Sequence, residues 1–187
     1  EASAIKASGS ARNWLITAKL ACLLSAKTAE AEAQLRRLKY SRTEIQAVST
    51  VLKFLPQLFS ANLVETNQAI AVPASNLNLS RREQYFFFQA VGTTFPAIAV
   101  LAIAQGLAIE AIAPLIERFL NPNDPIAHST PILTGQDLMT ALNLPPGPVI
   151  GQLLAAIQLA KAEGLLSTPA DALSLAADLI AEHTPKA

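Results

Sequence analysis

Arginine and lysine side chains that suit phosphate binding gather at two places in the sequence. The first group joins the end of one expected helix to the start of the next, and its members are Arg36, Arg37, Lys39 and Arg42. The second group lies in the first turn of another expected helix and consists of Arg81 and Arg82. Backbone N–H groups at a helix start bind anions together with such side chains. Both groups are therefore candidates for contacts with nucleic-acid phosphates, which position a ligand without sequence readout.

Each group also has a structural interpretation, which the sequence leaves open. The same cations suit a solvated basic surface, or ion pairs with Glu44 and Glu83. The charge distribution favours the first group: residues 1–60 carry nine Lys or Arg against four Asp or Glu, although the whole chain has a net charge of zero. Residues 61–133 carry three against five, and residues 134–187 carry two against five. Any nucleic-acid surface should therefore draw on the first third of the chain.

Residue types that perform catalysis or bind metals are sparse. His128 and His183 are isolated, and no set of Ser, His and Asp has a supporting spacing. We therefore predict no catalytic residue and no metal ligand. The single cysteine, Cys22, lies in an apolar run and is expected to be a buried thiol. One unpaired cysteine suits a reducing, cytoplasmic location.

Helices must position these residues, since no convincing strand pattern is present, and we expect an all-α fold. Four helix starts carry a Ser or Thr cap with an acidic residue three positions later: Ser41, Ser80, Thr134 and Thr168. Pro56 should bend or break the helix that starts after Ser41. The expected helices are 13–24, 29–38, 42–58, a short one within 63–72, 84–91, 96–107, 110–120, 135–142, 148–163 and 169–182.

The apolar stretch 95–116 is long enough to cross a membrane. Polar residues, a glycine and a proline interrupt it, so we expect a pair of buried core helices and no membrane association. The aromatic run from Tyr85 to Phe88 suits either base stacking or the core. Four successive residues cover a whole helix circumference, so at least two of them must lie in the core.

Several glycines lie in the stretch 133–164, near the expected ends of its helices. Gly147 is expected to cap a helix that starts at Pro148, and Gly164 to end it. Three glycines in this stretch either admit a phosphate at a helix start or allow a tight corner between helices, and both interpretations remain open. They are Gly135, Gly147 and Gly151.

Several motifs together resemble the C-terminal region of the bacterial tRNA nucleotidyltransferase and poly(A) polymerase superfamily, and its cyanobacterial members most of all. The superfamily includes CCA-adding enzymes and their CC-adding and A-adding relatives. The motifs are TGQDLM, GPVIG and LLAAIQLAKAEG within residues 134–164, LRRLKYSRTEI at 35–45, and LSRREQYFFFQ at 79–89. The matching positions in the first stretch are Thr134, Gly135, Asp137, Leu138, Met139, Gly147, Pro148, Gly151, Leu154 and Gly164.

This resemblance implies a parent enzyme that adds nucleotides to the 3′ end of tRNA without a template, in tRNA processing or in poly(A) addition. In the family, paired carboxylates of an N-terminal head hold Mg²⁺ on a nucleoside triphosphate. This chain has no D-x-D motif, no Gly-rich phosphate loop and no Arg-Arg-Asp motif. It also lacks an initiator methionine. We therefore expect a piece of a longer enzyme that is inactive alone and binds no cofactor itself.

We expect a helical body at residues 1–130, which includes a neck remnant, and a helical tail at residues 131–187. The expected partners are tRNA and the enzyme's own N-terminal head, and not DNA. The residues expected to bind RNA are Arg36, Arg37, Lys39, Arg42, Arg81, Arg82, Gly135, Gly147 and Gly151. The competing hypothesis is a helical protein–protein interaction or structural module with no RNA role.

Overall fold

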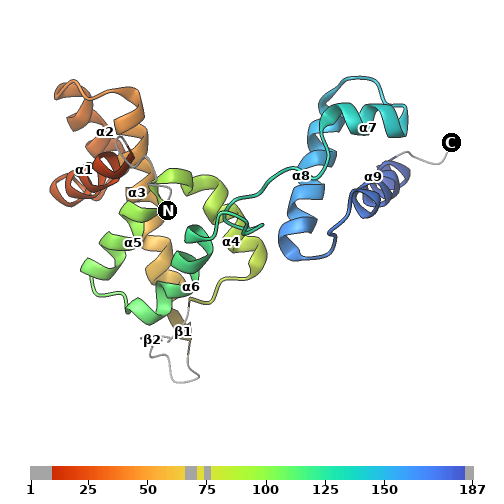
Figure 1. Cartoon of the computed structure of the whole chain (residues 1–187). Coiled ribbons are helices and arrows are strands. Elements are labelled where there is room, and N and C mark those ends of the chain that lie inside the picture. The colour runs from red at the N-terminus through yellow and green to blue at the C-terminus, as the bar shows by residue number, and fades with distance from the viewer. Residues whose placement is uncertain (1–9, 66–70, 74–76, 184–187) are drawn as a thin grey trace, which may run out of the picture. The chain divides into compact units, whose positions relative to one another are not determined.

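The computed structural model describes residues 10–65, 71–73 and 77–183 of the chain, and helices make up most of this part (Figure 1). The all-α class expected from the sequence is confirmed. In chain order the elements are α1 (Ser10–Leu23), α2 (Thr28–Arg37), α3 (Arg42–Ala61), β1 (Leu63–Glu65), β2 (Ala71–Pro73), α4 (Arg81–Val91), the short 3₁₀ helix η1 (Gly92–Thr94), α5 (Phe95–Ala104), α6 (Ile109–Leu120), α7 (Gly135–Leu142), α8 (Pro148–Glu163) and α9 (Pro169–His183).

The chain divides into two compact units. Unit 1 runs to Leu79 and resumes over Phe86–Leu120, whereas unit 2 consists of Ser80–Tyr85 and the chain from Asn121 onward. The first turn of α4 thus packs with the C-terminal helices and the rest of α4 with the N-terminal ones. This division falls earlier than the boundary after residue 130 that the sequence led us to expect.

Unit 1 is built around α3, which packs against α1, α2 and α5 (Figure 1). The buried face of α3 repeats with the helical period and includes Val48, Val51, Leu55 and Leu58. Helix α3 continues past Pro56 to Ala61, so the expected break does not occur. An aromatic cluster adds to the core: the ring centroids of Phe95 and Phe119 are 5.0 Å apart, and those of Phe88 and Phe95 are 5.1 Å apart.

The prediction of a helix within residues 63–72 is wrong. Strands β1 and β2 form an antiparallel pair there, with Val64 opposite Val72. The expected absence of strands was therefore also wrong, although the pair is short. The sequence also predicts a loop at residues 73–78 and an irregular lead-in at residues 1–10, of which residues 74–76 and 1–9 lie outside the described residues. At the described ends of these two segments, Pro73 belongs to β2 and Ser10 begins α1, so the prediction is wrong there.

The apolar stretch expected to form two core helices does so, as α5 and α6, which pack against each other. Helix α5 is buried at six of its ten positions. By length and composition the continuous helical stretch Arg81–Ala104 could cross a membrane, but half of its most apolar window is buried inside the protein. Burial of that extent is typical of a core helix.

The expected burial of Cys22 is wrong, because its side chain is exposed. The buried face of α1 consists of Thr17, Ala18 and Ala21, and Cys22 and Leu23 lie outside that face. The apolar run around Cys22 therefore does not report burial of every residue in it.

Unit 2 contains α7, α8 and α9, which contact one another around a core that includes Leu138, Leu153, Ile157 and Ala176. Helix α7 spans Gly135–Leu142, as expected, and begins with a capping box. Helix α8 begins after Gly147 and ends at Gly164, whose φ of 82° is the left-handed conformation that glycine adopts without strain. The expected caps of this unit are confirmed.

Candidate nucleic-acid interface

The turn between α2 and α3 presents the first group of basic residues. Helix α2 ends with paired backbone hydrogen bonds: the N–H of Lys39 donates to Arg36 O at 3.1 Å, and the N–H of Tyr40 donates to Leu35 O at 3.1 Å. This pattern requires a left-handed residue, and Lys39 supplies it with φ 60°. A lysine in that conformation is uncommon, because its Cβ crowds the backbone.

Helix α3 starts directly after this turn with a capping box. The Ser41 N–H donates to Glu44 Oε2 at 2.9 Å, and the Glu44 N–H donates to Ser41 Oγ at 3.3 Å. Hydrogen bonds from Ser41, its side chain first, hold the pKa of Glu44 below its ordinary value. Glu44 therefore stays ionised at neutral pH as part of the cap. Among the residues that the structure describes, no ion pair joins Glu44 to an arginine, which was the alternative interpretation.

The four cations of this turn differ in what they contact. Arg36 forms an ion pair with Glu32 at 3.0 Å, and Glu32 also accepts from Ser49 Oγ at 3.0 Å. Arg37, Lys39 and Arg42 are exposed, and none has a hydrogen-bond or ion-pair partner for its side chain among residues 10–65, 71–73 and 77–183. We call Arg37, Lys39 and Arg42 the α2–α3 corner. Three solvated cations so close in sequence can contact successive phosphates without breaking a bond within the protein.

The second basic group is engaged inside unit 2. Arg81 Nε donates to Ala162 O at 3.1 Å, where the C-terminal carbonyls of α8 lack helical partners. Arg82 Nη1 lies 3.7 Å from Glu163 Oε1. Glu83 is part of the α4 capping box, in which it accepts from Ser80 N at 2.8 Å. The expected alternative of ion pairs between these arginines and Glu83 is replaced by contacts with the end of α8.

The three glycines expected at an anion site have different surroundings. A Cβ at Gly135 would lie 3.2 Å from Ile150 Cγ2, so Gly135 serves the contact between α7 and α8. Among the described residues, no atom beyond the adjoining backbone lies within 4 Å of the corresponding position at Gly147 or Gly151. The structural interpretation required a close contact between helices at Gly151, and the structure has no such contact among the described residues. Both residues leave the start of α8 exposed.

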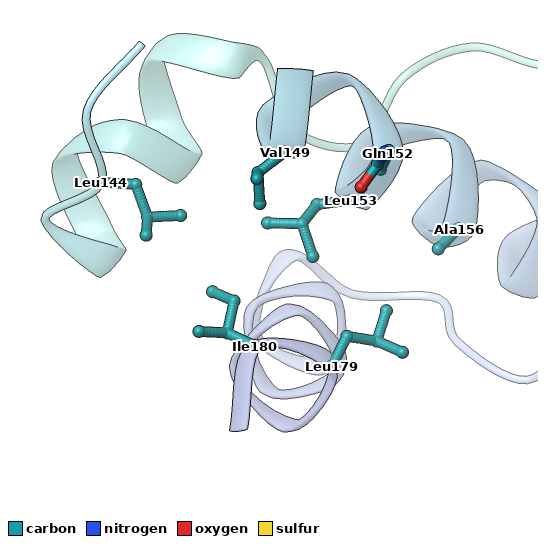
Figure 2. Close-up of a pocket in the computed structure, with 7 residues that line it drawn as sticks. All are labelled: Leu144, Val149, Gln152, Leu153, Ala156, Leu179 and Ile180. Atoms are coloured by element: carbon teal, nitrogen blue, oxygen red, sulfur yellow. The ribbon is translucent and has the colours of Figure 1, made fainter. Parts of the chain in front are cut away.

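An apolar pocket of about 420 Å³ lies beside this exposed helix start, within unit 2. Figure 2 shows Val149 and Leu153 of α8 facing Leu179 and Ile180 of α9, with Leu144 at one end. Gln152 is the polar side chain of its lining. This pocket suits an apolar group and offers no charge to a phosphate.

The aromatic run on α4 serves the core. Tyr85, Phe87 and Phe88 are buried, and Phe86 is 52% exposed. The rings of Phe87 and Phe95 meet edge to face, 6.1 Å apart. The expectation that at least two of the four lie in the core is confirmed, and Phe86 alone has the exposure that base stacking requires.

Sequence reasoning missed a small polar pocket in unit 1 beside the α2–α3 corner. It has a volume of about 200 Å³, and its lining comes from α1, α3 and the region of η1: Trp14, Thr17, Thr43, Glu44, Ala47, Thr93 and Thr94. The three segments are far apart in sequence, so only the single tryptophan could have drawn attention to it. Within the described ranges no three His, Cys, Asp or Glu side chains gather to hold a metal ion.

Comparison with known proteins agrees with the motifs. Residues 9–177 match the family model described as tRNA nucleotidyltransferase domain 2. A CC-adding tRNA nucleotidyltransferase from Synechocystis sp. is 37% identical over 170 residues, which are 90% of this chain and 38% of that relative. No solved structure matches the chain. The resemblance drawn from the sequence is confirmed, and the chain belongs to the tRNA nucleotidyltransferase domain 2 family.

Proposed function

We propose that this chain is the tRNA-binding region of a template-independent tRNA nucleotidyltransferase. It holds tRNA so that the 3′ end reaches a catalytic head, which is carried N-terminal to it. The observation that supports this most is the α2–α3 corner, where Arg37, Lys39 and Arg42 are solvated cations in a chain of a tRNA-enzyme family.

The division of charge between the units supports an RNA contact through unit 1. Unit 1 carries ten Lys or Arg against seven Asp or Glu, whereas unit 2 carries four against seven. RNA phosphates are attracted by the net positive charge of unit 1 and repelled by the net negative charge of unit 2. We therefore propose that the RNA-binding surface centres on the α2–α3 corner, and that Arg81 and Arg82 mainly stabilise unit 2.

The chemistry of nucleotide addition belongs to the head in this proposal. Paired carboxylates that hold Mg²⁺ on a nucleoside triphosphate would come from that region. The similar Synechocystis protein is a CC-adding enzyme, so we propose the addition of C residues as the reaction that this chain serves.

One binding experiment tests this function. The full chain is titrated onto a labelled tRNA transcript that lacks its CCA end, and onto an unstructured RNA of equal length, at two salt concentrations. We expect tighter binding to the tRNA and weaker binding at the higher salt, since Lys and Arg contacts to phosphate release counterions. Absence of binding to either RNA at low salt would contradict the proposal.

A second candidate function is protein docking without an RNA role. Three residues of α1 favour it, because Leu15, Ile16 and Leu23 are 42%, 46% and 82% exposed. Such an apolar surface is typical of a protein contact. A chain that binds no RNA in the experiment above, but that binds the separately produced catalytic head of the enzyme, would have this function.

A further inference from the structure

The polar pocket of unit 1 has the components of a site for one RNA base. Its volume of about 200 Å³ is several times the roughly 30 Å³ of a water molecule in the liquid. It is smaller than the roughly 300 Å³ at which pockets for drug-sized ligands begin. The space therefore suits one planar ring system, with the sugar and phosphate remaining outside.

Two polar groups of the lining have capacity left for a ligand. Glu44 uses Oε2 for both hydrogen bonds from Ser41, and Oε1 has no partner in the described part of the chain. The hydroxyl of Thr93 is likewise without a partner among the described residues, and Thr93 is exposed. An ionised carboxylate only accepts hydrogen bonds, so Oε1 selects a ligand group that donates.

Trp14 supplies the aromatic part of the lining. It is half-buried in α1 and lines the pocket, so part of its side chain is accessible to a ligand. Unstacked RNA bases are bound by stacking on aromatic side chains together with hydrogen bonds to their edges. Arg42 directly precedes Thr43 of the lining, so the cations of the α2–α3 corner lie next to the pocket along the chain.

We propose that this pocket binds a single unstacked RNA base that carries an exocyclic amino group, with cytosine preferred over uracil. The amino group of cytosine donates to Glu44 Oε1, whereas uracil presents an acceptor oxygen at the same position and is repelled by the carboxylate. The aromatic ring of Trp14 stacks on the base, and the α2–α3 corner contacts the adjoining phosphates. This inference rests on the proposed RNA-binding function. It adds that the RNA bound at the α2–α3 corner has an unstacked base beside the phosphates that the corner contacts.

Trp14 is the single tryptophan of the chain, so the tryptophan fluorescence of the folded protein comes from a residue that lines this pocket. The full chain is titrated with single-stranded oligocytidylate and with oligouridylate of equal length. We expect oligocytidylate to quench Trp14 at an about tenfold lower concentration, the effect of one hydrogen bond to a charged group.

Two matched variants separate the pocket from the fold. Glu44→Gln preserves a capping box, because glutamine serves at the same position, but its amide also donates. The preference for oligocytidylate should therefore fall to about twofold or less. Glu83→Gln makes the same change in the α4 capping box of unit 2 and should leave the preference intact.

The outcomes are distinct. Quenching that favours oligocytidylate and loses this preference only in Glu44→Gln supports the inference. If tRNA binds but neither oligonucleotide quenches Trp14, or if both variants keep the preference, the pocket is not a base site and the proposed function stands. If neither tRNA nor the oligonucleotides bind, the proposed function and this inference both fail.

Discussion

Arg81 Nε donates to the carbonyl oxygen of Ala162 at 3.1 Å and so ties the first turn of α4 to the last turn of α8. The guanidinium also lies within 4 Å of the position that a Cβ would occupy at Gly164. Sequence alone makes the Arg81–Arg82 pair resemble the Arg36–Arg37 pair. In the structure the two pairs differ: Arg81 and Arg82 contact the end of α8, whereas Arg37 is exposed to solvent.

Replacing Arg81 by alanine should destabilise unit 2 by about 1 kcal/mol, since a helix-end carbonyl loses its charged donor. Denaturation in urea, followed by far-ultraviolet circular dichroism, measures the change. Arg42→Ala is the matched control, as the Arg42 side chain has no partner among the described residues. A larger loss of stability in the control would contradict this role of Arg81.

Replacing Lys39 by glycine should stabilise unit 1 by about 1 kcal/mol, because glycine adopts the left-handed conformation without strain. Lys39→Ala removes the same charge and keeps the strain, so its stability should match the wild type. Urea denaturation followed by Trp14 fluorescence measures both. In the tRNA titration the two variants should weaken binding equally. Unequal weakening would show that the backbone, and not the charge, of residue 39 matters for binding.

Acid should destabilise the protein through its capping boxes. Hydrogen bonds from Ser41 and Ser80 lower the pKa of Glu44 and of Glu83 from an ordinary value of 4.5. The unfolded chain therefore takes up these protons first, and the stabilisation is present above about pH 4.5 and is lost as the pH falls through the lowered values. Unfolding free energies at pH 6.5 and pH 3.5 test this.

Glu44→Gln provides the control for that pH dependence, since it keeps the cap and removes one titrating group. Its unfolding free energy, followed by Trp14 fluorescence, should change less between the two pH values than that of the wild type. An equal change in both proteins would contradict the assignment to Glu44.

Gly151→Ala should stabilise α8 by about 1 kcal/mol, because alanine favours a helix interior and the new Cβ would meet no described atom within 4 Å beyond the adjoining helix backbone. Gly135→Ala is the contrast, as its Cβ would press on Ile150 at 3.2 Å and should gain less. Urea denaturation followed by circular dichroism compares them. If Gly151→Ala also weakens tRNA binding, the exposed start of α8 contacts RNA. Unchanged binding would leave Gly151 without an RNA role.

The helix ends that local chemistry determines could be predicted from sequence. Thr134 with Asp137, and Gly147 followed by Pro148, set the starts of α7 and α8 through bonds within a few residues. The pair of β1 and β2 could not be predicted in this way. Leu63–Glu65 is too short to show an alternating pattern, and its pairing with Ala71–Pro73 is not local.

The site was harder to predict than the fold. Sequence spacing located the cations of the α2–α3 corner, but the ion pair of Arg36 with Glu32 and the contact of Arg81 with Ala162 depend on how the helices fold and pack. Trp14 meets Thr93 in a pocket only because α1 packs against η1 and α3. Cys22 was misplaced because an apolar run does not say which helix face is buried.

The salt dependence of tRNA binding tests the role of the α2–α3 corner most directly. The logarithm of the affinity is measured against the logarithm of the salt concentration for the wild type and for the Arg37→Ala, Arg42→Ala double variant. Losing two phosphate contacts should reduce the slope by about 2.

Lys27→Ala serves as the control, because Lys27 is exposed but paired with Glu30 at 3.0 Å. It should leave the slope nearly unchanged. A double variant with the wild-type slope, or one that changes no more than Lys27→Ala does, would contradict the account that this corner holds tRNA.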